Sequence, residues 1–543
     1  MPENQAFAWK SHSGFVWANN DYDRYKDGTE EDVTNSAANP TPDCNYTVNG
    51  NRCIPCPRDL EDYARLWVSG VSNTLSRLPS GSTVTLNWGD VGSPNPANPV
   101  IDIFQAADAD GGMGYLTNGA TATNQINTNL CQYVGRLGPG GSIQLNASTF
   151  SNSWAGDHYI WCGVVSGSGQ LNLTIADGSG NVLAQSSQYI QIQDIKQMYE
   201  RWTIGEDPKT APGAPMSTNK LVADGQPQFQ YSYDPAYDTN DSYIVFVHGW
   251  NMPAWEKDRF AETAYKRLYW QGYKGRFGSF RWPCNLFNPA LLLELNLAQY
   301  NVGERTAWQC GQPFENFLAN LNGQYPGKVY VLAHSMGNIV TGEALRLAGT
   351  NVVVNTYVAT QAAVSARAYD NTVPADATNS YTPHVYTPDS EGHYFTNGAP
   401  PYFNDIGGAS HFADYFNAQD YALGYWVTDQ NFKADSSSYL YTTPSAQFPS
   451  GYYNRASFFT TRSLVFPTNT YEIFSMAAQS YSFALGAETN IASTFSLRTP
   501  VNLQAPPYSF SNLRTGHSFE FHSDNMTVGV YWHQLLSSFG ITP

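Results

Sequence analysis

The fold of the second half of this chain follows from seven residues, Val331-Leu332-Ala333-His334-Ser335-Met336-Gly337. Residues 328–332 before the turn are mostly apolar and partly β-branched, which is typical of a buried strand. Residues 338–347 after it place apolar side chains at helical spacing. A serine on such a strand-to-helix turn is held in a strained conformation with its hydroxyl exposed above a sheet. Ala333 and Gly337 suit this turn because small residues let strand and helix approach closely.

This turn resembles the nucleophile elbow of the α/β-hydrolase superfamily, G-x-S-x-G, with Ala333 at the first glycine position as in lipase-like members. A second resemblance lies upstream, where the apolar strand Tyr243–Val247 ends in His248-Gly249. A segment rich in helix formers, 254–269, follows it. A plain strand-to-helix turn would also explain His248-Gly249, but the order and separation of the two motifs favour the hydrolase interpretation.

The resemblance implies a mostly parallel sheet with helices on both faces and a cap, and it implies roles for three residues. Ser335 would be the nucleophile. The backbone N–H groups of Trp250 and Met336 would form the oxyanion hole, because the superfamily takes one donor from the loop after the early strand and one from the residue after the nucleophile.

The acid of the triad is expected after the nucleophile and before the histidine, as the superfamily order is Ser, Asp or Glu, then His. A short strand that ends near Asn417 places Asp420 in the loop just beyond it, which favours Asp420. Asp414, inside that strand, and Asp370, after the preceding strand, remain alternatives.

The general base is expected in the loop ahead of the last helix, which the pattern predicts over 528–539. His517 lies there next to a glycine and is favoured over His522, while His533 falls inside the helix. His334 is not proposed as a base, because a turn that exposes Ser335 directs its neighbour elsewhere. A surface histidine with ordinary hydrogen bonds is the alternative for each of these positions.

Composition narrows the partners and the compartment. The net charge of −17 argues against binding to nucleic acid or anionic lipid, since both rely on Lys and Arg. No apolar run approaches the roughly 20 residues needed to span a bilayer. Charged residues make up only 13% and aromatic residues 14%, which with the many Gly, Ser, Thr, Asn and Tyr residues resembles an extracellular protein. We therefore expect secretion, from a bacterium, with a signal removed ahead of the polar start Met1-Pro2-Glu3-Asn4.

Seven cysteines are grouped along the chain as three, two and two. Proximity suggests the disulfides Cys131–Cys162 and Cys284–Cys310, and one pair among Cys44, Cys53 and Cys56, although sequence alone does not fix pairing. Cys44, Cys53 and Cys56 are also candidates for zinc, but no second ligand group accompanies them.

The first half reads as β-structure. Segments 81–88, 142–147 and 170–175 alternate polar and apolar residues and are separated by turn residues, which predicts an antiparallel β-sandwich over 75–195. Residues 1–74 form an acidic, cysteine-containing segment. Two assignments stay open for it: a separate segment ahead of the sandwich, or a part of the β domain.

A short helix is predicted over 195–202. The linker is assigned to 196–241, of which 203–240 are rich in Pro, Gly, Asp and Tyr. The catalytic α/β domain then extends over 242–543. Two insertions, about 362–410 and 432–513, fall where the superfamily builds a cap. Their Tyr, Phe and Pro residues suit either an apolar acyl or alcohol group or simple packing on the sheet.

An acidic cluster near the start contains Asp21, Asp23 and Asp27, with Gly28 for a turn. Oxygen ligands at alternating positions suit a structural Ca²⁺ ion, although the spacing is not that of an EF-hand loop and a solvated acidic loop explains it equally well.

The function expected from the resemblance is carboxylic ester hydrolysis through a Ser-Asp-His triad and an acyl-enzyme, with no cofactor for catalysis. Substrates would be small or polymeric esters. Two alternatives stay open: a carbohydrate-acting esterase whose sandwich contacts a polysaccharide, and a non-catalytic surface binding or adhesion protein on a hydrolase scaffold.

Overall fold

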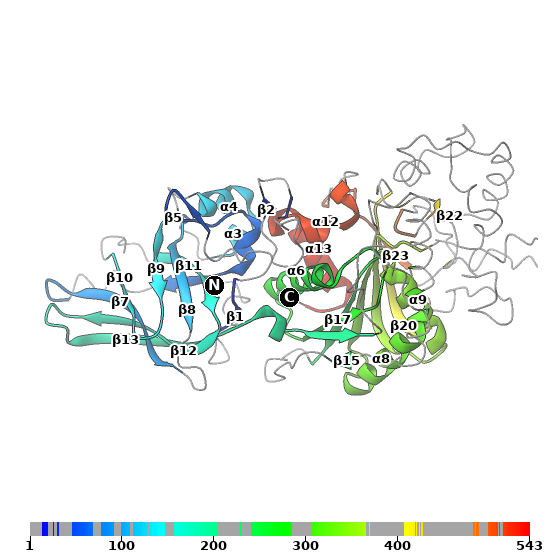
Figure 1. The fold of residues 1–543 in the computed structure, drawn as a ribbon, viewed down its shortest axis with the longest axis horizontal. Coiled ribbons are helices and arrows are strands. Elements are labelled where there is room, and N and C mark those ends of the chain that lie inside the picture. Colours follow the sequence, from blue (N-terminus) through cyan, green and yellow to red (C-terminus); the bar gives the residue numbers. More distant parts are fainter. Residues whose placement is uncertain are drawn as a thin grey trace, which may run out of the picture.

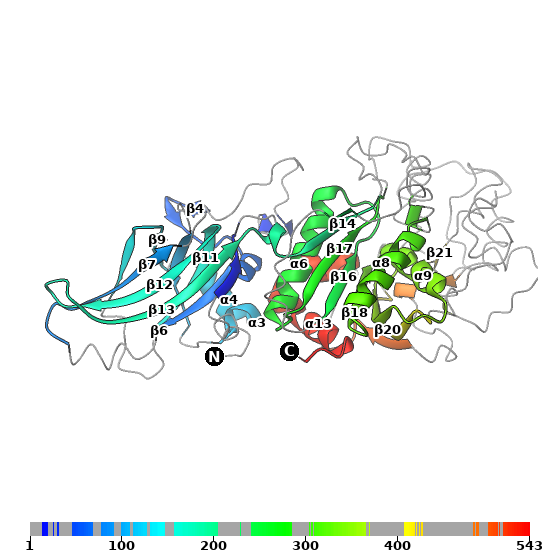
Figure 2. The same ribbon diagram turned by 90° about the horizontal axis from the view of Figure 1, so that it is seen from below.

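Two lobes follow one another along the long axis of the molecule, an all-β lobe and an α/β lobe (Figures 1 and 2). They are seen in a computed structural model, which describes residues 14–19, 25–26, 30–31, 46–68, 78–91, 99–108, 112–127, 131–146, 157–204, 228–229, 241–284, 303, 306–307, 309–364, 369, 407–418, 420, 423, 425–426, 482–483, 485–487, 498–508, 510 and 514–542.

The all-β lobe is a sandwich of two sheets, as predicted. The first sheet has the order β1 (Gly14–Trp17), β13 (Val182–Gln193), β12 (Gly167–Ala176), β7 (Thr83–Val91) and β10 (Ser142–Leu145). The second has the order β6 (Tyr63–Val68), β11 (Asp157–Val165), β8 (Val100–Gln105) and β9 (Tyr133–Leu137). Alternate residues such as Ile143 and Leu145 of β10 point into the core between the sheets.

The sandwich begins earlier in the chain than position 75. Strand β1 pairs in parallel with β13, and β6 pairs with β11, so the segment 1–74 supplies one edge strand to each sheet. Between them lies a 3₁₀ turn, η2 (Arg58–Asp62), in which every residue is buried. Charged residues are almost never fully buried unless they are paired, so η2 must face partners in another part of the molecule.

The α/β lobe is built on a sheet of eight described strands, of which seven run parallel. Their order is β15 (Gln228–Phe229), β14 (Glu200–Thr203), β17 (Arg276–Arg281), β16 (Tyr243–Val247), β18 (Val329–His334), β19 (Val354–Thr360), β20 (Ala409–Phe416) and β23 (Arg498–Asn502). Only β15 is antiparallel to its neighbour. Every residue of β16 and β18 is buried, as expected for central strands covered on both faces.

Helices cover both faces of this sheet. Helix α6 (Ala254–Trp270) and helix α13 (Asn525–Ser538) lie on the face that looks towards the sandwich, whereas α8 (Gly311–Gln324) and α9 (Gly337–Ala348) lie on the opposite face (Figures 1 and 2). The last helix thus packs beside the first helix of the lobe, which brings the C-terminal part of the chain close to the sandwich.

Two elements differ from the sequence-based prediction. The helix predicted over 195–202 is a single 3₁₀ turn, η4 (Ile195–Gln197), followed by strand β14, which pairs in parallel with β17. The linker therefore contributes a sheet strand, because pairing with a neighbouring strand outweighs the weak local helix preference. Strand β23 lies inside the range 432–513 predicted as cap, yet it extends the sheet beside β20. Most of both predicted insertions falls outside the described residues.

A search of the described helices for a membrane span finds none with the length and hydropathy that crossing a bilayer requires.

Candidate active site

Ser335 occupies a sharp turn at the end of the central strand β18. Its φ angle is +52°, in the left-handed region that non-glycine residues seldom adopt, and its backbone N–H donates to the carbonyl oxygen of Thr360 at 3.1 Å. The Asn338 side chain donates to the carbonyl oxygen of Ser335 at 2.8 Å and is itself held by the Tyr357 hydroxyl at 2.6 Å. These contacts explain how the strained turn is maintained.

The small residues around the turn are required by contacts with strand β16 and its loop. A Cβ atom at Gly337 would lie 2.6 Å from the carbonyl oxygens of both Val247 and His248. A Cβ atom at Gly249 would lie 2.8 Å from the Cβ of Ser335 and 3.3 Å from its Oγ. The loop after β16 therefore lies directly against the serine hydroxyl, which no side chain at position 249 would permit.

Three residues distant in sequence meet at this turn. The Oγ of Ser335 lies 2.8 Å from Nε2 of His517, and Nδ1 of His517 lies 2.7 Å from Oδ2 of Asp420. The Asp420 side chain is fully buried and that of His517 is 13% exposed. An ionised carboxylate has no proton to donate, so in this hydrogen bond Nδ1 of His517 carries the proton. Nε2 is left to accept from the serine hydroxyl.

Asp420 lies in a short loop after β20. The backbone N–H of Asp420 donates to the carbonyl oxygen of Asn417 at 3.0 Å. His517 belongs to the 3₁₀ turn η11 (Arg514–Ser518), and a short helix, α12 (Phe519–His522), continues from it. Each of the two side chains thus comes from a loop beyond the sheet, as the superfamily order predicts.

The alternative residues lie elsewhere. Asp414 sits inside β20, near Tyr357 and Tyr369; burial raises the pKa of both phenols, and the charge of Asp414 adds a smaller upward contribution. The His522 ring packs edge-on against another aromatic ring, and His533 is inside α13. Asp370 lies outside the described residues.

The two backbone groups predicted for the oxyanion hole flank the serine. Met336 is the N-cap of α9, and the first N–H groups of a helix have no acceptor within it. Trp250 follows Gly249, where an added Cβ atom would lie 2.8 Å from the Cβ of Ser335. The loop is braced by Trp282, whose Nε1 donates to the carbonyl oxygen of His248 at 2.8 Å and whose ring stacks on that histidine.

His334, the neighbour of the nucleophile, packs beside the ring of His517, with the two ring centroids 5.0 Å apart. Its Nε2 contacts the backbone carbonyl oxygen of His517 at 2.7 Å, and its ring packs against Phe260 and Phe521. Burial holds the pKa of His334 well below its ordinary value, so the ring is neutral and Nε2–H is the donor.

Sequence reasoning missed a second buried carboxyl group, that of Glu520, three residues after His517. It accepts a hydrogen bond from the Thr360 hydroxyl at 3.0 Å. Burial raises the pKa of Glu520 to about 8, with Asp420 adding a smaller upward contribution, so this acid holds its proton at neutral pH. Its position inside a segment already singled out for histidine was the only sequence signal available.

The predicted disulfides Cys131–Cys162 and Cys284–Cys310 are wrong, because none of the six described cysteines forms a disulfide. The Cys284 thiol instead contacts the carbonyl oxygen of Met252 at 3.4 Å. Burial raises the pKa of Cys131 to about 12 and that of Cys310 further still. These thiols are core residues, and proximity in sequence was a poor guide to pairing.

The residues predicted to bind calcium, Asp21, Asp23 and Asp27, lie outside the described residues, as does Cys44 of the zinc alternative. Across the described ranges, no group of three or more His, Cys, Asp or Glu side chains is arranged to hold a metal ion.

A search of curated proteins finds no match to this chain. Residues 234–365, which carry both the His248-Gly249 loop and the Ser335 turn, match a family described as "Alpha/beta hydrolase of unknown function (DUF900)". The match ends before Asp420 and His517. Together with the parallel sheet and its helices on both faces, this match supports an α/β-hydrolase fold for the second half of the chain.

Proposed function

We propose that this protein is a secreted serine hydrolase that cleaves carboxylic esters through an acyl-enzyme. The observation that carries the proposal is the unbroken hydrogen-bonded chain from Ser335 through His517 to Asp420, with contacts of 2.8 and 2.7 Å. A serine hydroxyl is a weak nucleophile until a base takes its proton and a third group orients that base. The proposal of secretion rests on composition.

In the proposed reaction Ser335 Oγ attacks the ester carbonyl carbon while His517 Nε2 takes the hydroxyl proton. Asp420 keeps the imidazole in the correct tautomer and stabilises the imidazolium that forms. His517 then gives the proton to the leaving alcohol, and the acyl group remains on Ser335. Water repeats the same steps on the acyl-enzyme, which releases the acid.

The tetrahedral oxyanion would be held by the backbone N–H groups of Trp250 and Met336. One such donor contributes roughly 3 to 4 kcal/mol to lowering the barrier in a comparable serine enzyme. This part of the proposal is supported by the close approach of the Gly249 loop to Ser335 and by the position of Met336 as N-cap of α9. Esters are favoured over amides as substrates because the elbow and the His-Gly loop are lipase-like.

The test is labelling of the full chain with a fluorophosphonate probe, followed by peptide mapping and assay on esters of varied acyl length. We expect an adduct on Ser335, absent from Ser335→Ala and lost in His517→Ala. Turnover of at least one ester class should accompany it. An unmodified Ser335 in folded protein, together with no ester turnover, would contradict the proposal and favour a binding protein on a hydrolase scaffold.

A second candidate, a carbohydrate-acting esterase, is favoured by one face of the sandwich. On the first sheet, Tyr189, which is 37% exposed, pairs with exposed Gln170 on the neighbouring strand and lies two residues from exposed Ser187. An exposed aromatic ring flanked by hydroxyl and amide groups suits the faces and hydroxyls of sugars. Co-sedimentation of the full-length Ser335→Ala protein with insoluble polysaccharides should then occur and should weaken in a Tyr189→Ala background; equal recovery of both in the supernatant would contradict it.

A further inference from the structure

The segment that carries His517 has its backbone held by side chains from elsewhere in the chain. Five carbonyl oxygens between positions 516 and 523 each accept a hydrogen bond from a side chain. The pairs are Gly516 with Gln361 Nε2, His517 with His334 Nε2, Glu520 with Arg267 Nη1, His522 with Arg58 Nη1 and Ser523 with Arg267 Nη2. Hydrogen bonds from charged donors are among the stronger ones in proteins, so the two arginines contribute most to this restraint.

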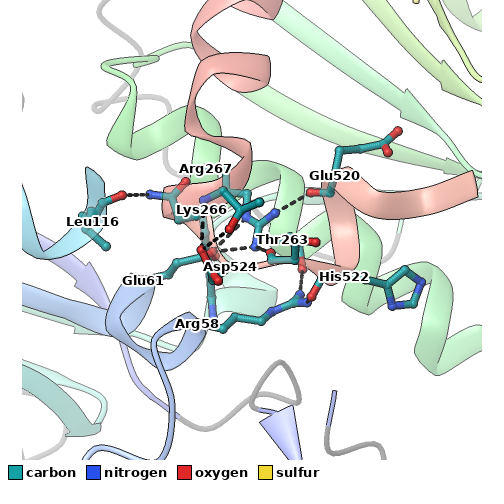
Figure 3. A network of polar contacts seen from close by, with 12 residues as sticks. Arg58, Glu61, Leu116, Thr263, Lys266, Arg267, Glu520, His522 and Asp524 are labelled. Carbon is teal, nitrogen blue, oxygen red and sulfur yellow. Dashed lines mark hydrogen bonds and ion pairs between the residues drawn. The ribbon is translucent and has the colours of Figure 1, made fainter. Parts of the chain in front are cut away.

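These two arginines come from different lobes. Arg267 is on α6 of the hydrolase lobe, whereas Arg58 is in η2 of the N-terminal lobe, 464 positions before its partner His522. Arg58 is fully buried, and its second terminal nitrogen donates to the Thr263 hydroxyl on α6 at 2.7 Å. Figure 3 shows both guanidinium groups reaching towards the backbone of the C-terminal segment.

Both arginines belong to an interdomain cluster, which we define as Arg58, Glu61, Asp62, Lys266 and Arg267. Arg267 Nε donates to Glu61 at 2.8 Å, and Lys266 Nζ lies 2.6 Å from Asp62, with all four side chains fully buried. Buried charges need partners, and here each cation from α6 meets an anion from η2. Removing η2 would therefore leave the α6 cations buried without their partners.

We propose that Arg58 and Arg267 are positioning residues for His517, so that the N-terminal lobe is a structural part of the active site. This inference rests on the proposed function of His517 as general base. Neither arginine contacts the triad; each fixes the backbone that follows the histidine, and a histidine displaced by about 1 Å can lose about 100-fold in rate.

The test compares Arg58→Met with a matched control, Arg65→Met. Arg65 is also a buried arginine of the N-terminal lobe, with bonds of 2.8 and 2.9 Å to Asp108, but its contacts lie within the sandwich. We expect Arg58→Met to lower kcat about 10-fold to 100-fold with little change in KM, and to slow fluorophosphonate labelling of Ser335. Arg65→Met should leave the kcat of the folded protein near the wild-type value even where it lowers Tm.

A readout independent of turnover is amide hydrogen exchange measured by mass spectrometry on peptides covering 514–524. Arg58→Met should raise exchange there while Arg65→Met does not, because local restraint is what exchange reports. If Arg58→Met does not fold, Thr263→Val removes one anchor of the arginine and should give a smaller change in the same direction. Arg58→Lys should restore part of both signals.

The outcomes separate the two proposals. Exchange and kcat unchanged in Arg58→Met and Thr263→Val would overturn the positioning role. Arg58→Met could show faster exchange over 514–524 while the wild-type protein neither labels nor turns over esters. This result would support positioning of the segment while rejecting the hydrolase function. Equal loss of kcat in Arg58→Met and Arg65→Met would mean that any damage to the sandwich has this effect, which also overturns the specific role of Arg58.

Discussion

The ring of His517 and the backbone that follows it are held by two regions of different construction. The ring lies between Ser335 and Asp420, with one hydrogen bond on each nitrogen. The backbone is held by the interdomain cluster, where Arg58 and Arg267 donate to carbonyl oxygens and the two α6 cations pair with carboxylates of η2. The triad has a single acid, Asp420, that orients the ring. The interdomain cluster has three buried cations and two buried anions, so its charges nearly balance.

This difference separates chemistry from stability. A group that exchanges a proton with the substrate changes rate when it is altered, but the fold hardly depends on it. A buried ion pair acts the other way, because removal of one partner leaves the other charge without compensation. Variants of the triad should therefore lower kcat with little change in stability, whereas variants of the cluster should lower stability, with a loss of kcat added where the arginine holds the backbone after His517. Each of the following measurements can break or refine that contrast.

The largest effect is expected at the nucleophile. Ser335→Ala should lower kcat by about 10⁶-fold, to the level of assay background, since no alkoxide can form. Thermal unfolding should be unchanged or slightly improved, because the side chain is small and the strained φ of +52° remains. Ester turnover and Tm of the same preparation check this. A Tm lowered by many degrees would show that the triad also stabilises the fold.

The next effect is expected at the acid. Asp420→Asn should lower kcat by about 10⁴-fold, because an amide no longer fixes the histidine tautomer. Asp414→Asn is the matched control, as it makes the same change in a buried aspartate of β20 near Tyr357 and Tyr369. Steady-state kinetics on the folded proteins decide between them. Activity retained in Asp420→Asn and lost in Asp414→Asn would reverse the assignment of the acid.

At Lys266 of the interdomain cluster we expect a loss of stability rather than a loss of kcat. Lys266→Met removes one partner of a fully buried pair with Asp62 and should lower the free energy of unfolding by about 3 to 5 kcal/mol. Lys328→Met, in the exposed pair with Asp241, should cost at most about 1 kcal/mol. Urea denaturation of both variants measures the difference. Similar values for the two would mean that the cluster is solvated.

The effect expected to change least at any single pH step is a pH dependence at Glu520, which lies between the two regions. Its pKa is about 8 in the folded protein and ordinarily 4.5. Between these values the folded state keeps a proton that the unfolded state has released, so the free energy of unfolding falls as pH rises, by at most about 1.4 kcal/mol per pH unit. Glu520→Gln should remove this slope while keeping the acceptor for Thr360. Tm of both proteins from pH 5 to 8 checks it; parallel curves would contradict it.

The hydrolase half was largely readable from sequence because its signals are local. The strand, the turn at Ser335 and the helix are adjacent, and their hydrophobic patterns follow periods that a short window reveals. Asp420 and His517 were chosen by their order in the chain, and the structure brings both to the serine. Their roles stay predictions until activity is measured.

The remainder could not be read because it depends on contacts between distant segments. Nothing local to Arg58 indicates that its partner is the carbonyl oxygen of His522. Strands β14 and β23 form at opposite sides of the sheet through pairing with neighbours that lie far along the chain. The disulfides were inferred from sequence proximity, which says little about whether two buried thiols face each other.

The contact between Arg58 and His522 also bears on how the protein is made. A ribosome delivers Arg58 of η2 464 positions before His522, and contacts between such distant positions are slow to form. The N-terminal sandwich can assemble its own sheets before α6 is synthesised. Glu61 and Asp62 of η2 pair with the α6 cations only afterwards. His517 follows Ser335 by 182 positions, so the growing chain holds the nucleophile turn long before the histidine that contacts it.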